Sequence, residues 1–94
     1  MALKRAHVYI TGRVQGVFYR GWVSENAHRL GLRGWGRNRF DGSVEAVFEG
    51  SGEVVGQMMK LCHDGPPHAH VDTVLDDYSE PVEGLASFEV KSTS

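Results

Sequence analysis

Hydrophobic residues follow two periodicities along the 94-residue chain. Residues 7–11 alternate between apolar and polar side chains, which is typical of a half-buried strand. Further extended runs predict strands at 33–39, 43–49, 71–78 and 87–91. In two other segments apolar residues recur at spacings of three and four, which predicts helices from Arg20 to Leu30 and from about Glu53 to His63. The element order is therefore βαββαβ, followed by a short additional strand.

Residues with defined turn preferences stand at the boundaries of these elements. Gly31 follows the first helix as a C-terminal cap, and Ser51 precedes the second as an N-terminal cap. Asp41-Gly42 provides the positive φ that a tight hairpin requires. Together these features predict an α+β fold, a ferredoxin-like βαββαβ sandwich. In it an antiparallel sheet carries two helices on one face and a short extra C-terminal edge strand. We expect residues 1–94 to form a single domain.

The composition argues against several classes of function. The formal net charge is -2, so the chain lacks the basic surface that attracts nucleic acid or anionic lipid. No apolar run reaches the roughly 20 residues of a membrane span, and the N-terminal residues lack the apolar stretch of a signal peptide. A single cysteine cannot form an internal disulfide. We expect a cytoplasmic monomer with no nucleic-acid or membrane partner.

A glycine-spaced loop, G-R-V-Q-G-V-F-Y-R (residues 12–20), joins the first strand to the first helix. None of the five residues before Arg20 is a strong N-cap, so the first helical amides have no side-chain acceptor. The glycines let successive amides converge on an anion, the helix dipole adds positive potential, and Arg20 adds a guanidinium that fits two phosphate oxygens. The candidate cradle consists of the backbone amides of Gln15, Gly16, Val17, Phe18 and Tyr19. On these residues alone, a phosphate cradle and an ordinary loop whose amides bind water fit equally well.

The same stretch resembles the first motif of the acylphosphatase family, G-x-V-Q-G-V-x-[FY]-R, at every fixed position. Residues 34–44, G-W-G-R-N-R-F-D-G-S-V, resemble its second motif, and the likeness continues through 65–72 to 88–90. The resemblance implies that Arg20 is the catalytic phosphate-binding arginine and that Asn38 orients the attacking water. It also implies hydrolysis of acyl phosphates such as acetyl phosphate, carbamoyl phosphate or 1,3-bisphosphoglycerate, without a metal, cofactor or phosphoenzyme. Inorganic phosphate or sulfate would then bind as product or inhibitor.

Two positions depart from the family pattern. Gly36 stands where the family usually has alanine or valine, in the strand that presents Asn38, and a glycine there is expected to loosen the strand. His70 stands where an arginine is common, at the start of the fourth strand, and we assign no consequence to it.

Other reactive side chains are better explained by packing or solvation. Cys62 shares the apolar stripe of the second helix, so we expect a core thiol rather than a nucleophile. A metal site is disfavoured by the spacing of its candidate ligands, His63, Asp64, His68 and His70. The acidic run is expected to form a solvated face; it consists of Asp72, Asp76, Asp77, Glu80 and Glu83.

Two functions from other classes remain as alternatives. An RNA-recognition module shares this layout, but it needs a basic sheet face with stacking aromatics, whereas V-E-A-V-F-E (residues 44–49) is acidic. An anion sensor, or a relative of the acylphosphatase-like domains of larger carbamoyl-transferring proteins, would carry the same loop. Metal-free turnover of an acyl phosphate distinguishes catalysis from binding alone.

Overall fold

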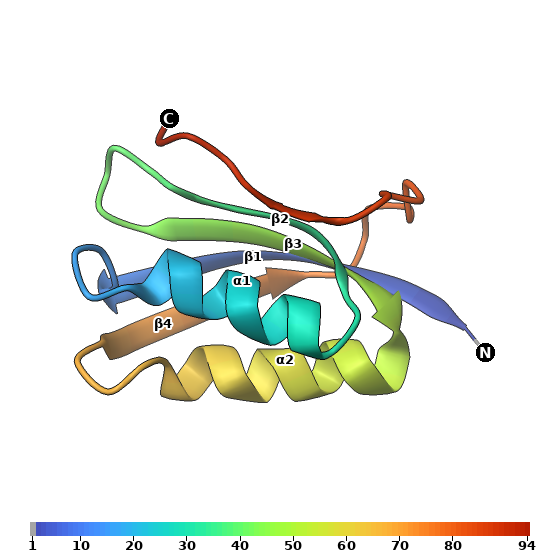
Figure 1. Cartoon of the computed structure of the whole chain (residues 1–94), viewed down its shortest axis with the longest axis horizontal. Helices are drawn as coiled ribbons and strands as arrows, with labels where there is room; N and C mark the ends of the chain where they lie inside the picture. Colours follow the sequence, from blue (N-terminus) through green and yellow to red (C-terminus); the bar gives the residue numbers. More distant parts are fainter. Residues whose placement is uncertain (1) are drawn as a thin grey trace.

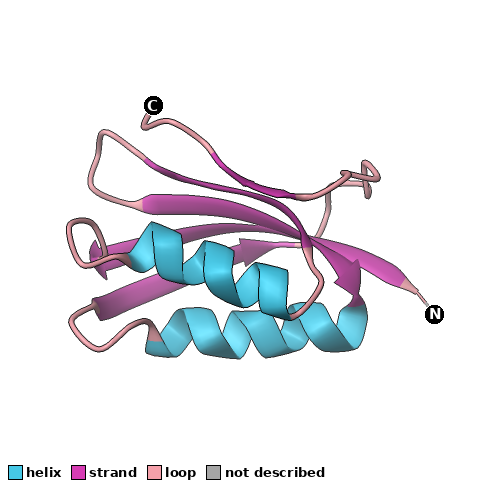
Figure 2. Cartoon of the chain, in the orientation of Figure 1, coloured by secondary structure: helices cyan, strands magenta, loops and turns pink. Residues whose placement is uncertain are grey.

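The computed structural model describes residues 2–94. It contains one five-stranded sheet of order β4-β1-β3-β2-β5, with two helices that both lie on the same face (Figures 1 and 2). The predicted ferredoxin-like sandwich is therefore confirmed. The elements in chain order are β1 (Leu3–Arg13), α1 (Tyr19–Arg29), β2 (Arg33–Asn38), β3 (Val44–Ser51), α2 (Gly52–Asp64), β4 (His70–Asp77) and β5 (Phe88–Val90).

The sheet is antiparallel except at its C-terminal edge. β1 lies between β3 and β4, and β3 pairs with β2, all in antiparallel register. β5 instead runs parallel to β2, with Gly34 opposite Phe88 and Gly36 opposite Val90. The predicted antiparallel sheet with a short extra C-terminal edge strand is thus confirmed, and the sequence left the direction of that edge strand open. The segment after β4 crosses to the other edge, so β5 enters from the end at which β2 begins (Figure 1).

The core lies between the helices and the covered face of the sheet. The side chains on this face of β1 and β3 are fully buried, among them Val8, Ile10 and Phe48. Val23 from α1 and Met58 from α2 meet them from the opposite side. The period of two in the strands and of three to four in the helices places these residues on facing surfaces.

The predicted caps are present. Ser51 precedes α2 and accepts a hydrogen bond from the Val54 amide at 3.3 Å. At the end of α1 the Gly31 amide donates to His28 O at 3.1 Å, in the conformation that glycine favours after a helix. These caps fix where each helix begins or ends relative to the sheet.

The open face of the sheet carries a buried network of charges. Arg5 and Glu49, on β1 and β3, are 7% and 3% exposed and pair at 2.8 Å. His7, also on β1, contacts Glu45 through Nε2 at 2.6 Å and Glu80 through Nδ1 at 2.7 Å. Glu80 therefore belongs to this network, as does Glu83, which lies 3.5 Å from Arg5. The prediction that the whole acidic run is a solvated face is wrong for Glu80, which is half-buried because the segment after β4 folds back over the open face, whereas Glu83 pairs with Arg5 but stays exposed.

Candidate active site

The loop that follows β1 begins close to the point where β1 and β3 stop pairing. β1 pairs with β3 as far as Ile10 opposite Val44, and beyond that point it pairs only with β4. A register shift between Thr11 and Gly12 marks the division. Gly12 has φ 123°, and a Cβ there would lie 2.1 Å from the carbonyl oxygen of His70, so the close approach of β1 and β4 requires glycine.

The loop ends at the uncapped N-terminus of α1. Phe18 occupies the N-cap position in the left-handed conformation, with φ 63° and ψ 22°, and no side chain caps the helix. Among residues 2–94, none of the loop hydrogen bonds between backbone groups is donated by the amides of residues 15–19. Gly16 has φ 74°, as expected for a nest of converging amides. Both glycines of the loop have the positive φ that the sequence predicts, and the phosphate cradle itself stays a prediction.

Arg20 lies in the first turn of α1 and is half-buried. Its Nη1 donates to the carbonyl oxygen of Lys91 at 3.2 Å. Within the described part of the chain Arg20 forms no ion pair, whereas Arg5 and Arg37 each pair with glutamate. A guanidinium that is held by a backbone carbonyl but not neutralised remains available to an anion at the helix N-terminus.

Asn38 is the last residue of β2 and is half-buried. Its side-chain Oδ1 is buried and makes no hydrogen bond, and it is the only such buried side-chain atom among residues 2–94. Buried acceptors are nearly always paired, so an unpaired one indicates a group reserved for a ligand or water. This feature fits an amide oxygen that accepts a hydrogen bond from a water molecule.

Hydrogen bonds from two segments bring the loop, Arg20 and β2 to the same end of the sheet. The first is the segment after β5, in which the Lys91 amide donates to Gly36 O at 2.8 Å and the Ser94 amide to Asn38 O at 3.2 Å. This segment therefore contacts both Arg20 and the strand that presents Asn38. The second is the loop itself, in which the Gln15 side chain reaches the β2–β3 hairpin.

The Gln15 side chain is a site feature that sequence reasoning missed. The sequence assigned only its backbone amide to the cradle, whereas its Nε2 donates to Arg39 O at 2.7 Å and to Ser43 O at 2.8 Å. A signal was present, because Gln15 is the only side-chain amide between Gly12 and Arg20. Its partners lie 24 and 28 residues away, so their identity depends on the fold.

The charges beside Asn38 on β2 are compensated. Arg37 pairs with Glu45 at 2.6 Å, and Glu45 also contacts His7. Burial acts to raise the pKa of Glu45, but the hydrogen bonds from His7 and Arg37 outweigh it and hold that pKa below its ordinary value. Glu45 is thus a carboxylate engaged in structural pairing, and it is not free to act as a catalytic base.

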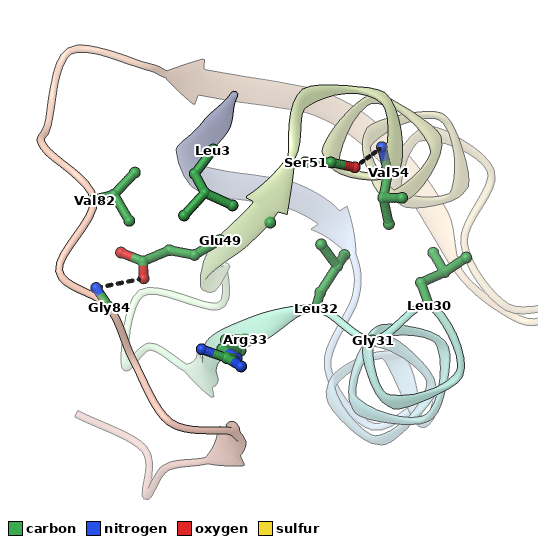
Figure 3. Close-up of a pocket in the computed structure, with 11 residues that line it drawn as sticks. Leu3, Leu30, Gly31, Leu32, Arg33, Glu49, Ser51, Val54, Val82 and Gly84 are labelled. Atoms are coloured by element: carbon green, nitrogen blue, oxygen red, sulfur yellow. Dashed lines mark hydrogen bonds between the residues drawn. The ribbon is translucent and has the colours of Figure 1, made fainter. Parts of the chain in front are cut away.

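Two cavities differ in their relation to the loop. One, of about 430 Å³, borders the loop and is lined by Arg13, Gly16, Val17, Phe18 and His68. The other, of about 420 Å³, lies between the end of α1 and the start of α2 (Figure 3). Its wall is mostly apolar, with Leu3, Leu32 and Val82 among its residues, and its one carboxylate, Glu49, accepts a hydrogen bond from the Gly84 amide. Only the first cavity adjoins the predicted site residues.

The alternative reactive groups do not form a second site. Cys62 is fully buried, and burial raises the pKa of its thiol to about 12, so the predicted core thiol is confirmed. Among residues 2–94, no three His, Cys, Asp or Glu side chains lie together in a metal-binding group. His70, a departure from the family pattern, contacts Asp72 at 3.1 Å on the exposed surface of β4.

Comparisons with known proteins show what the chain is similar to. A family model described as acylphosphatase matches residues 6–90. A protein named acylphosphatase from Trichormus variabilis is 55% identical over 89 residues, which cover 95% of this chain and 87% of that protein. A solved acylphosphatase structure from Coxiella burnetii superposes with a TM-score of 0.90 at 35% identity and covers 95% of this chain and 93% of that one. The acylphosphatase structure from Bacillus subtilis gives a TM-score of 0.90 at 31% identity, with 96% and 99% coverage. No helix among the described residues is long and apolar enough to cross a membrane.

Proposed function

The chain belongs to the acylphosphatase family and is a hydrolase, and we propose that it cleaves the carboxyl–phosphate bond of small acyl phosphates. The substrate class is that of acetyl phosphate, carbamoyl phosphate and 1,3-bisphosphoglycerate. The products are a carboxylate and inorganic phosphate, and phosphate or sulfate inhibits by occupying the same cradle. Cytoplasmic location, the monomeric state and the single-domain organisation of residues 1–94 stay predictions.

The amides of residues 15–19 and the guanidinium of Arg20 bind the phosphoryl oxygens in this proposal. These donors are without protein acceptors in the described loop, and Arg20 is not neutralised by a carboxylate. Donors that are already oriented stabilise the charge on the phosphoryl group at no cost of reorganisation. Phosphoryl transfer depends mainly on such positioning and electrostatics.

Asn38 places the attacking water. The observation that carries this role is its buried, unpaired Oδ1 at the end of β2. The water oxygen attacks phosphorus, the bond from phosphorus to the acyl oxygen breaks, and its electron pair leaves with the carboxylate. The amide of Asn38 is too weakly basic to accept the water's proton, so this proton passes to a phosphoryl oxygen. A carboxylate is a stable leaving group and needs no general acid.

Metal-free turnover tests this proposal. Purified protein in a chelating buffer is mixed with acetyl or benzoyl phosphate, and loss of the anhydride is followed with and without orthophosphate. We expect turnover that orthophosphate inhibits competitively. Asn38→Ala should lose about 10² or more in kcat with little change in the inhibition constant of phosphate. A wild-type protein that binds phosphate but leaves the anhydride intact would instead be an anion sensor.

A further inference from the structure

The Gln15 side chain bridges the division of the sheet at the candidate active site. Its Nε2 carries two hydrogens and donates to two carbonyl oxygens, Arg39 O at 2.7 Å and Ser43 O at 2.8 Å. These carbonyls belong to the two sides of the β2–β3 hairpin, which is closed by the Arg39 amide donating to Ser43 O at 2.8 Å. Both amide hydrogens of the Gln15 side chain are thus donated to the residues that close the hairpin loop.

The backbone offers no sheet pairing across this gap. Beyond Ile10, β1 continues with β4 alone, while the hairpin continues β2 and β3. A cavity of about 170 Å³ lies in the gap, lined by Thr11, Gly12, Asp41, Gly42 and Ser43. The loop with its amides therefore follows β1 on the β4 side of the gap, whereas Asn38 is the last paired residue of β2, opposite Val44, and leads into the hairpin. The Gln15 side chain connects the loop to the β2–β3 hairpin by direct hydrogen bonds.

We propose that Gln15 is a positioning residue that sets the separation between the phosphate cradle and Asn38. The inference rests on the proposed function and assigns to the side chain a role that its backbone amide does not have. The chain of contacts is short: Gln15 holds the carbonyl of Arg39, and Arg39 follows Asn38 directly. Displacement of a reacting group by about 1 Å can cost about 10²-fold in rate. Loss of the two hydrogen bonds should therefore impair the placement of water more than the binding of phosphate.

Kinetic constants distinguish this role from a general contribution to stability. Gln15→Met keeps the length of the side chain but removes both donors. We expect kcat for acetyl phosphate to fall by about 10- to 100-fold, while the inhibition constant of orthophosphate changes by less than about 3-fold. The cradle amides and Arg20 belong to the loop and α1, so they keep their mutual geometry. Gln57→Met, on the exposed face of α2, is the matched control and should retain wild-type constants.

A double-mutant cycle tests whether Gln15 acts through Asn38. If it does, adding Gln15→Met to Asn38→Ala should lower kcat by less than about 2-fold further, because the positioned group is already gone. Multiplicative losses would overturn the proposal, as would a Gln15→Met enzyme with wild-type kcat. A wild-type protein that fails to hydrolyse acyl phosphates would refute the proposed function instead.

Wild-type protein supplies a test that does not depend on the folding of a variant. In nuclear magnetic resonance spectra, the side-chain amide protons of Gln15 should exchange with solvent at least about 10-fold more slowly than those of exposed Gln57, because both are hydrogen-bonded. Equal exchange rates would show that the bridge does not persist in solution, and the proposal would fail.

Discussion

Arg20 on α1 is tied to Lys91 beyond β5 by one hydrogen bond, from its Nη1 to the backbone carbonyl oxygen at 3.2 Å. The same Lys91 donates its amide to Gly36 O on β2. The segment after β5 therefore links the helix that carries the arginine to the strand that carries Asn38. A backbone carbonyl orients the guanidinium without neutralising its charge, so the charge remains available for a phosphoryl group.

Arg20→Ala should remove both binding and turnover. We expect kcat/KM for acetyl phosphate to fall by at least about 10²- to 10³-fold and competitive inhibition by orthophosphate to weaken in parallel. Arg29→Ala is the control, because Arg29 is exposed at the end of α1 and bonds only to Asn26 in the same helix. Steady-state kinetics of the two variants provide the comparison. Arg20→Ala with unchanged phosphate inhibition would contradict the role of Arg20 in the cradle.

Alanine at Gly12 should cost far more stability than alanine at Gly16. Both have positive φ, a penalty of about 1–2 kcal/mol for a residue with Cβ. A Cβ at Gly12 would also lie 2.1 Å from the His70 carbonyl oxygen, whereas a Cβ at Gly16 meets nothing within 4 Å. Overpacking adds about 1–3 kcal/mol at Gly12 alone. Urea unfolding of the two variants tests the difference, and equal losses would mean that β1 and β4 are farther apart at this point.

Gly36→Ala should be tolerated. A Cβ there would meet Cζ of the Phe88 ring at 3.7 Å, an ordinary van der Waals distance, and the φ of Gly36 is not in the left-handed region. The ring of Phe88 covers the position and replaces the packing that a larger residue would provide. Loss of glycine's freedom in the unfolded chain should raise the free energy of unfolding by about 0.4–1 kcal/mol. A loss of more than about 1 kcal/mol in urea unfolding would show that Phe88 packs more tightly on the strand.

The buried carboxylate of Glu49 should make the free energy of unfolding decrease at acidic pH. Burial acts to raise the pKa of Glu49. Hydrogen bonds from the Arg5 side chain and from the three consecutive backbone amides of residues 83–85 outweigh burial and lower this pKa below its ordinary value of 4.5. A depressed folded-state pKa contributes stability that is fully present above the unfolded pKa and is lost as the pH falls through the folded one.

The free energy of unfolding measured in urea should therefore decline below about pH 4.5, and less steeply in Glu49→Gln than in wild type. At neutral pH this variant should be less stable by about 1–3 kcal/mol, because Arg5 and three amides lose a charged acceptor. Glu25→Gln, exposed on α1, is the control for removal of a charge. Parallel pH profiles for wild type and Glu49→Gln would exclude Glu49 as a source of the acid sensitivity.

Elements with regular hydrophobic periods could be predicted from the sequence, whereas those stabilised by distant charges could not. α2 follows its apolar stripe, and its observed start agrees with the Ser51 cap. The alternating pattern predicts β1 over 7–11, but the strand begins at Leu3, because the charged Arg5 occupies a buried position where it pairs with Glu49. Pairing across 44 residues, from Arg5 to Glu49, leaves no local pattern.

In the candidate site, too, local features could be predicted from the sequence and contacts between distant segments could not. The missing cap and the glycines are local features, so the open amides could be predicted. The roles assigned to Arg20 and Asn38 came from resemblance to a family, since a strand asparagine and a helix arginine have no distinctive pattern by themselves. The bridge from Gln15 to the hairpin, and the contact from Arg20 to Lys91, depend on how β1, β2 and β5 meet in space.

A crystal structure of the protein soaked in orthophosphate tests most directly whether these donors hold a phosphate. We expect the ion within hydrogen-bond distance of the amides of residues 15–19 and of the Arg20 guanidinium, with Asn38 facing it across a water molecule. Phosphate absent from this loop, with the same amides bonded to neighbouring protein atoms, would contradict the account.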